Sequence, residues 1–271
     1  MNTISLKKCL VKEIFVPEIL PAIPVRFLPA YRCIQRLERD DRYLAAFIFG
    51  SVARGEATED SDLDVHVITN EDNPCTNINH PFIGGVKLDL TFLSLDQLKA
   101  KTQPAMEQRE RIPMMAEIMI VFDKTNEVAK LQETARQVTP RGILPDEYQF
   151  MQFMFYHGND KAERNLAHDP QTALLVMHVG LNEFLKYHYQ LHQKWWVSSK
   201  WLLADLRSWD QQLAQLLESF VATSEVHEKF CLWSAIIDHI LAPVGGRQPI
   251  AENICDCAVC QRDLATLQGI L

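Results

Sequence analysis

Residues 43–69 constrain the fold more tightly than any other part of the chain. They begin with the apolar run YLAAFIF, which is closed by Gly50 and is typical of a buried strand followed by a turn. They end with SDLDVHVITN, in which apolar and polar residues alternate and so predict a half-buried strand. The apolar face of this strand holds Leu63, Val65 and Val67, and its polar face holds Asp62, Asp64 and His66. The chain is therefore expected to contain a sheet with one partly acidic face.

Further strands and helices are expected on either side of this pair. Residues 25–41 predict a helix interrupted by Pro29, VKLDLTFLS alternates as a third strand that contains Asp89, and EIMIVFD predicts another strand. Ser94 and Gln97 form a capping box that opens a helix at SLDQLKAK, and NEVAKLQETARQ predicts the next helix. Strands mixed with helices in this order indicate an α+β domain.

The second half of the chain has the periodicity of helices. A break near VTPRGILPDE precedes it, and the segment PQTALLVMHVGLNEFLKYHYQLHQ then has Asp169 at the N-cap and Pro170 in the first turn. Helical spacing of apolar residues follows at Leu174, Met177, Leu181, Phe184 and Leu185. The segments SSKWLLADLRSW and TSEVHEKFCLWSAIIDHILA predict two more helices. We therefore predict a mixed N-terminal domain over residues 1–142 and a helical bundle over residues 143–271.

Charge and cysteine content narrow the partners and the compartment. The formal net charge of −8 at pH 7 is a poor match for a long nucleic acid, whose binding depends on neutralising phosphates. No apolar run is long enough to span a bilayer, and the N-terminal segment MNTISLKKCLVKEIF does not have the pattern of a signal peptide. Seven cysteines, an odd number, favour a reducing compartment over a disulfide framework. We expect a cytoplasmic protein with small or cationic substrates.

The acidic face is the strongest candidate for a metal site. Residues two apart on a strand point the same way, so Asp62 and Asp64 project together and repel each other unless a cation lies between them. Carboxylate oxygens are ligands that suit magnesium. If the strand that contains Asp89 pairs beside the second strand, Asp89 joins the cluster as a metal ligand, as the general base for an acceptor hydroxyl, or as both.

The turn between the first two strands is a candidate phosphate site. Gly50 and Ser51 end the first strand, and residues 52–54 can open a helix whose backbone N–H groups would face phosphates. A glycine allows the backbone to come close, and Arg54 adds a cation nearby. Two metal ions opposite such a turn can clamp an in-line displacement at a triphosphate.

In these residues the chain resembles the nucleotidyltransferase family that includes DNA polymerase β and the aminoglycoside and lincosamide nucleotidyltransferases. The family pattern is a Gly-Ser pair, about ten residues, Asp-x-Asp, and a later acidic residue on another strand. It is matched in order by Gly50, Ser51, Asp62, Asp64 and Asp89. The resemblance covers roughly residues 43–94. It implies a polymerase β-like domain that uses two Mg²⁺ ions to transfer a nucleoside monophosphate from an NTP, expected to be ATP, with release of pyrophosphate.

The helical domain is expected to shape the acceptor side of the site, in a cleft with the first domain. The acceptor we expect is a hydroxyl on a small molecule, such as an aminoglycoside-like antibiotic. Lys200 is a candidate phosphate contact, and Glu183 is a candidate base or acceptor contact, or else a solvated glutamate. Two roles are possible for the tryptophans of this domain: they either line the acceptor pocket or pack in the core. These tryptophans are Trp195, Trp196 and Trp201.

Other interpretations stay open at this point. The chain fits a nucleotidyltransferase that modifies a protein or a tRNA in a toxin–antitoxin pair, or a module that binds nucleotide without catalysis. Three tail cysteines, Cys255, Cys257 and Cys260, either bind zinc with His239 or Cys231 as a fourth ligand or are reduced thiols without a role. The oligomeric state cannot be inferred from the sequence.

Overall fold

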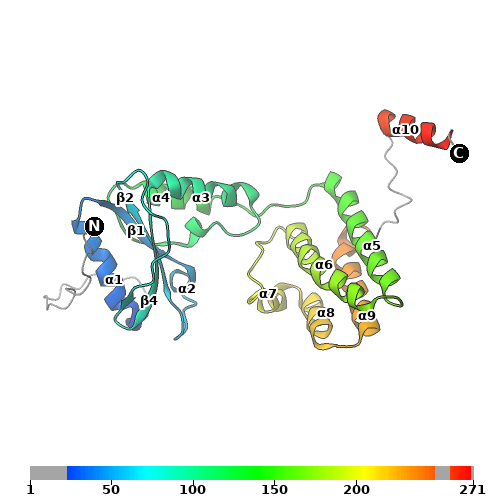
Figure 1. The fold of residues 1–271 in the computed structure, drawn as a ribbon, viewed down its shortest axis with the longest axis horizontal. Helices are drawn as coiled ribbons and strands as arrows, with labels where there is room; N and C mark the ends of the chain where they lie inside the picture. Colours follow the sequence, from blue (N-terminus) through cyan, green and yellow to red (C-terminus); the bar gives the residue numbers. More distant parts are fainter. Residues whose placement is uncertain (1–22, 248–256, 270–271) are drawn as a thin grey trace. The chain divides into compact units, whose positions relative to one another are not determined.

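The computed structural model describes residues 23–247 and 257–269, which divide into two compact units, Met1–Thr139 and Pro140–Leu271 (Figure 1). The domain boundary predicted between residues 142 and 143 remains a prediction. Two parts of the sequence predictions lie outside the described residues: the N-terminal segment MNTISLKKCLVKEIF, and Cys255 of the predicted zinc set. No helix within the described ranges is both long and apolar enough to cross a membrane.

Within the described residues, the first unit is built on a five-stranded mixed sheet of order β3-β4-β2-β1-β5. Its strands are β1 (Tyr43–Phe49), β2 (Leu63–Thr69), β3 (Phe82–Ile83), β4 (Val86–Leu93) and β5 (Met119–Asp123). β1 pairs antiparallel with β2 and with β5, β4 pairs antiparallel with β3, and β2 pairs parallel with β4. The four strands predicted from apolar runs and alternation are present. β3 was not predicted, because two residues are too few to show a period.

The helices of the first unit begin largely where the sequence predicts. They are α1 (Leu28–Gln35), α2 (Gly50–Ala53), α3 (Leu95–Gln108) and α4 (Glu127–Arg136), with short 3-10 turns at Val25–Phe27, Arg36–Arg39 and Met114–Glu117. The Ser94–Gln97 capping box is present, with the Gln97 N–H 3.2 Å from Ser94 Oγ and the Ser94 N–H 2.9 Å from Gln97 Oε1. The interruption predicted at Pro29 is wrong. Pro29 lies in the first turn of α1, where its missing N–H has no intrahelical role.

Each face of the sheet has its own apolar layer. Val65, Leu88 and the other inward residues of β2 and β4 pack with Phe27 and Tyr31 beneath α1. The opposite face packs Phe47 and other apolar residues against α3 and α4. Since neighbours on a strand alternate, Asp64 and His66 belong to this second face. The predicted acidic face is therefore partly covered by helices, and Asp64 lies near the end of that cover, as the second residue of β2.

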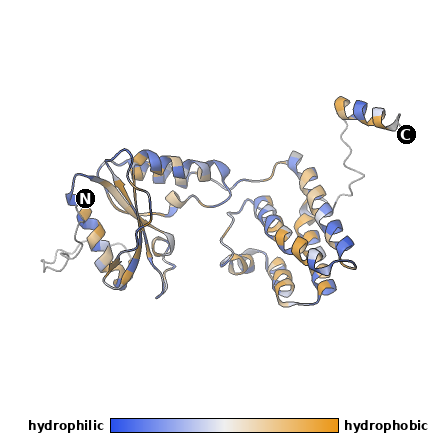
Figure 2. Ribbon diagram, in the orientation of Figure 1, coloured by the Kyte–Doolittle hydropathy of each residue, from blue (hydrophilic) through white to orange (hydrophobic). Residues whose placement is uncertain are grey.

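Within its described residues, the second unit consists of helices and the turns that connect them, with no strand. Its helices are α5 (Tyr148–Asn165), α6 (Pro170–Leu191), α7 (Leu202–Trp209), α8 (Gln211–Ala222), α9 (Val226–Leu241) and α10 (Ala258–Gln268), with 3-10 turns at Pro145–Glu147 and Ala242–Val244. Asp169 caps α6, accepting the Thr172 N–H at 3.0 Å. The apolar stripe of α6 faces a core that includes Phe155 and Trp233, and the helices show mixed hydrophobic and hydrophilic colour in Figure 2. The predicted α+β class with a helical C-terminal region is confirmed.

Candidate active site

Three aspartates converge at one end of the sheet in the first unit. The parallel pairing of β2 and β4 sets Asp64 opposite Asp89, and Asp62 directly precedes β2. One carboxylate oxygen from each residue lies within 4.8 Å of the other two. The sequence predicted this cluster on the condition that the two strands pair, and they do. Whether the three aspartates act as metal ligands remains a prediction.

Burial and like charge act together on Asp64. Burial, and after it the negative charges of Asp62 and Asp89, raise the pKa of Asp64 to about 6, against the opposing cations Arg54 and Lys87. A carboxyl group with such a pKa is held in an environment that disfavours its charge. A cation at the centre of the three oxygens would remove that penalty.

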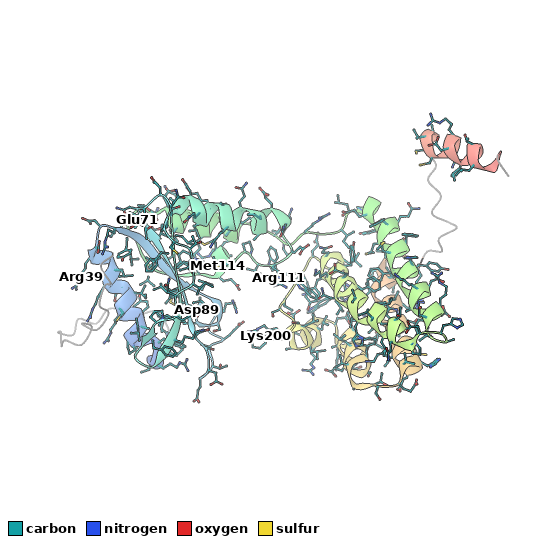
Figure 3. The ribbon with its side chains drawn as sticks, in the orientation of Figure 1. Arg39, Glu71, Asp89, Arg111, Met114 and Lys200 are labelled. Carbon is teal, nitrogen blue, oxygen red and sulfur yellow. The ribbon has the colours of Figure 1, made fainter. Side chains whose placement is uncertain are left out.

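Two hydrogen-bond partners of Asp89 were not predicted from the sequence. Lys87 Nζ lies 2.9 Å from Asp89 Oδ1 and 3.5 Å from Asp62 Oδ2, and His80 Nδ1 lies 2.7 Å from Asp89 Oδ1. Burial acts to raise the pKa of Asp89, but the hydrogen bonds from Lys87 and His80 outweigh it, and the net pKa is lowered. Figure 3 shows Asp89 on the sheet. Lys87 was within reach of the alternation argument, since it lies two residues before Asp89 on β4. His80 was not, because a loop brings it there.

Gly50 allows Asp64 to lie against the start of α2. Its φ is +70°, in the left-handed region, and a Cβ at this position would lie 2.1 Å from Asp64 Oδ2. Any other residue would therefore be strained and would also push the Asp64 carboxylate away. The sequence interpretation linked this glycine to the close approach of a phosphate, which remains a prediction. The structure adds the contact with Asp64 as a reason for glycine here.

The loop before Asp62 is held by hydrogen bonds. Ser61 Oγ accepts the Thr58 N–H at 2.8 Å, and the Ser61 N–H donates to the Thr58 carbonyl at 3.2 Å. Arg26 donates from its guanidinium to the Ser61 carbonyl. Arg26 has no motif signal in the sequence, because it reaches this loop from a distant turn. These bonds fix the backbone from which Asp62 projects.

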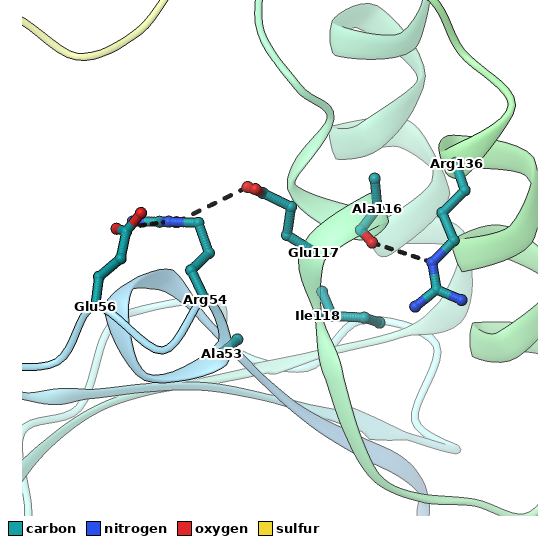
Figure 4. A pocket seen from close by; sticks show the side chains of 7 residues that line it. All are labelled: Ala53, Arg54, Glu56, Ala116, Glu117, Ile118 and Arg136. Atoms are coloured by element: carbon teal, nitrogen blue, oxygen red, sulfur yellow. Dashed lines mark hydrogen bonds and ion pairs between the residues drawn. The ribbon is translucent and has the colours of Figure 1, made fainter. Parts of the chain in front are cut away.

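Arg54 borders a cavity next to α2. Arg54 Nε lies 2.9 Å from Glu56 Oε2, and Arg54 Nη1 lies 3.9 Å from Glu117 Oε2. The cavity has a volume of about 390 Å³, and Figure 4 shows its lining residues, which include Arg136. Burial raises the pKa of Glu117, although the charge of Arg54 opposes this. The lining does not include the three aspartates, so the cavity adjoins the cluster through α2 and is not the cluster itself.

His66 is a packing residue in this structure. Its ring centroid lies 4.5 Å from that of Phe49 and 5.4 Å from that of Phe47. Burial, and after it the charge of Lys101, lowers the pKa of His66 to about 4, so the ring is neutral at neutral pH. These contacts account for His66 by packing, without a role in the site.

The remaining predicted site residues belong to the second unit. Lys200 lies in the turn before α7, with Nζ 5.5 Å from the centroid of the Trp201 ring (Figure 3). Glu183 is exposed on α6 and accepts a hydrogen bond from Lys186 at 3.0 Å. Trp196 is buried and Trp201 is 42% exposed. Roles for these residues in binding phosphate or acceptor remain predictions.

The tail cysteines are described only in part. Cys257 caps α10, accepting the Cys260 N–H at 3.4 Å. His239, considered as a fourth zinc ligand beside them, is hydrogen bonded to Asp210 at 2.8 Å in the second unit. The predicted zinc site at the tail therefore stays a prediction, and its histidine already has a different partner.

A comparison with protein families gives the class of the first unit. Residues 31–132 match the family described as "Nucleotidyltransferase domain". The matched range contains β1, α2, β2 and β4, and with them the Gly-Ser turn and the three converging aspartates. The chain carries a nucleotidyltransferase domain of the polymerase β-like superfamily, as its sequence resemblance indicated. Such a domain implies an NTP substrate, and the acidic cluster is consistent with the divalent metals that these domains generally use.

The other comparisons add less. A solved structure described as a nucleotidyltransferase-like protein from Exiguobacterium sibiricum 255-15 overlays with a TM-score of 0.46 and 12% sequence identity. The overlay covers 80% of this chain and 74% of that one. No curated protein matches the chain.

Proposed function

We propose that this protein is a magnesium-dependent nucleotidyltransferase that moves a nucleoside monophosphate from an NTP, ATP by preference, to a hydroxyl of a small molecule. An aminoglycoside-like antibiotic is the acceptor class we favour, and pyrophosphate is the second product. The observation that supports this most is the convergence of Asp62, Asp64 and Asp89 within a matched nucleotidyltransferase domain. A cytoplasmic location is part of the proposal, since an odd number of cysteines suits a reducing compartment.

The donor set fits magnesium. Its members are all carboxylates, which are hard oxygen ligands, and their crowding raises the pKa of Asp64 to about 6 through burial first and like charge second. The Lys87 ammonium already pairs with both Asp89 and Asp62, which indicates that this position favours a cation. When bound, a pair of Mg²⁺ ions supplies charge neutralisation at the triphosphate and activation of the acceptor oxygen.

The aspartates divide the work between binding and proton transfer. Asp62 and Asp64 are proposed to hold the ions from the start of β2. Asp89 is proposed to share them and to accept the proton of the acceptor hydroxyl, which requires its Oδ1 to be released from Lys87 and His80. Lys87 is then free to pair with the phosphates, and His80 lies within reach to take over the proton.

The Gly50–Ser51 turn is proposed to hold the phosphates. The first N–H groups of a helix have no partner inside it, and α2 starts at Gly50. Arg54 and Lys200 are the proposed cationic contacts. Because α2 is only one turn long, its contribution comes from these individual N–H groups and not from a helix dipole.

An acceptor screen tests the proposal. Radiolabelled ATP, GTP, CTP and UTP are each incubated with magnesium and a panel of aminoglycosides, other hydroxyl compounds, tRNA and protein. Pyrophosphate release and labelled product are both scored, with Asp64→Asn as the inactive control. Label on a small hydroxyl compound supports the proposal. Label only on tRNA or protein overturns the acceptor, and a screen in which no NTP yields pyrophosphate overturns the enzyme.

A further inference from the structure

A second cluster of metal-ligating groups lies in the helical unit, and the proposed function does not use it. His188 Nε2 on α6 and His239 Nε2 on α9 each lie 2.8 Å from Asp210 Oδ2, between α7 and α8. The ligand atoms of these three residues lie within 4.8 Å of one another. Three helical segments that are distant in the sequence thus direct two imidazoles and one carboxylate at a single point.

The backbone fixes the carboxylate in this position. Asp210 is the N-cap of α8, and its Oδ1 accepts the Leu213 N–H at 3.0 Å. Its own N–H donates to the Leu206 carbonyl at 2.7 Å, which closes α7. The cap uses one oxygen and leaves Oδ2 directed at both histidines. The orientation of the Asp210 carboxylate is therefore set by the backbone and does not depend on the two histidines.

The site is buried on the side of His188 and partly exposed to solvent on the side of His239. The side chains of His188, Asp210 and His239 are 1%, 12% and 21% exposed. The His188 ring stacks on Trp209 at a centroid distance of 5.1 Å, and Trp209 Nε1 is tied to Asp205 Oδ2 at 2.8 Å. A packed wall thus holds His188, while His239 gives an ion a path from solvent.

We propose that His188, Asp210 and His239 bind a divalent transition metal of the zinc class, which fastens α6, α8 and α9 together. Two imidazoles with one carboxylate suit zinc and its neighbours better than magnesium, which prefers an all-oxygen set. Tetrahedral zinc with bonds of about 2.0–2.1 Å spaces its ligands about 3.4 Å apart, so the cluster needs only a small spreading. The competing arrangement is a metal-free triad in which both Nε2–H groups donate to Oδ2.

Zinc titration of the full-length protein distinguishes the two arrangements. The protein is stripped with a chelator, and zinc is titrated against a chromophoric competitor in excess Mg²⁺, which saturates the aspartates of the first unit. Asp210→Asn keeps the cap, because asparagine also caps helices, and His239→Gln alters the most exposed ligand. His192→Gln is the matched control, since His192 is the C-cap of α6 and its ring centroid lies 4.6 Å from that of His188. The double change Cys257→Ser with Cys260→Ser removes the described tail thiols.

We expect a single tight equivalent of zinc in the wild type, the His192 control and the cysteine variant. Asp210→Asn and His239→Gln should weaken it by more than about a hundredfold, since loss of even an outer-shell partner costs about ten- to a hundredfold. Cobalt in place of zinc should give visible absorption without a thiolate band. Absence of tight zinc in the wild type overturns the proposal, and so does binding that survives both ligand variants. If a variant fails to fold, the wild-type cobalt spectrum decides: a thiolate band, or no tetrahedral signal, overturns the proposal.

Discussion

The acidic cluster of the first unit and the His–Asp–His cluster of the second show how two sites of similar size differ in physics. The first gathers three like charges on hard oxygens, with Asp62 39% and Asp89 26% exposed. The second joins two imidazole nitrogens to one carboxylate, with its most buried member only 1% exposed. Like charges at an exposed edge of the sheet favour a cation that exchanges with solvent and substrate, whereas a buried set of mixed ligands favours one that stays.

The largest expected effect comes from Asp64→Asn. This change keeps the shape of the side chain and removes one of the three negative charges, so transfer should fall by at least about a thousandfold because several kcal/mol of charge stabilisation are lost. Turnover with the best acceptor from the screen measures it. Zinc affinity of the second unit, measured in parallel, should be unchanged. Near-normal turnover in Asp64→Asn would contradict a catalytic role for the acidic cluster.

The two clusters also differ in how far the sequence could foresee them. Asp62 and Asp64 follow from the two-residue period of a strand, and Asp89 follows once β4 lies beside β2, which the alternation favours but cannot prove. His188 and His239 are 22 and 29 residues from Asp210, and only the packing of helices brings them together. Helical periodicity shows which face of a helix is apolar, but not which polar residues meet across a junction.

The same limit explains the smaller misses in the first unit. Lys87 shares the period of Asp89 and was within reach of the sequence, whereas His80 and Arg26 come from loops with no period. The two-residue strand β3 and the place of Pro29 in the first turn of α1 depend on local backbone geometry, which the sequence pattern does not reveal. The fold of the sheet was thus predictable, and the polar contacts around its aspartates were predictable only where they lie on strands.

The next effect separates two carboxylates that were both candidate bases. Asp89→Asn should lower turnover about a hundredfold to ten-thousandfold with every acceptor, the usual loss for a general base. Glu183→Gln should leave turnover and nucleotide affinity near the wild-type values, because Glu183 is exposed and paired with Lys186 on α6. Steady-state kinetics with two unrelated acceptors measures both. Full loss in Glu183→Gln together with near-normal transfer in Asp89→Asn would reverse the assignment.

A smaller effect is expected from Gly50→Ala. The new Cβ would meet Asp64 Oδ2 and displace a proposed metal ligand, so Mg²⁺ and NTP affinity should fall about tenfold or more, in the range of about ten- to a hundredfold that the loss of a ligand's support costs. Gly55→Ala is the matched control, because Gly55 has φ +73° but open space where its Cβ would lie. Calorimetric titration measures the affinities of both folded variants. Equal losses in the two would assign the effect to backbone strain and not to the contact with Asp64.

The smallest effect concerns the pH dependence of stability in the metal-free protein. Burial, and then the charges of Asp62 and Asp89, raise the pKa of Asp64 from 3.8 to about 6 in the folded state. The folded protein thus holds this proton more tightly than the unfolded chain, and the stability it contributes is present below pH 3.8 and lost as pH rises through about 6.

Asp64→Asn removes that loss, so the variant should be more stable than the wild type at pH 8 and no more stable at pH 3.5. After discounting for solvent at this half-exposed site, the gain is about 1 kcal/mol, or about 2–4 °C in Tm. Thermal unfolding at both pH values with a chelator present measures it. Saturating Mg²⁺ should make the wild type the more stable of the two proteins at pH 8. The ion stabilises the folded wild type by binding to it, and it binds the variant more weakly because the variant lacks one carboxylate ligand. A wild type that is the more stable protein at pH 8 without metal would mean that the three carboxylates do not repel one another, and that the cluster is not arranged to receive a cation.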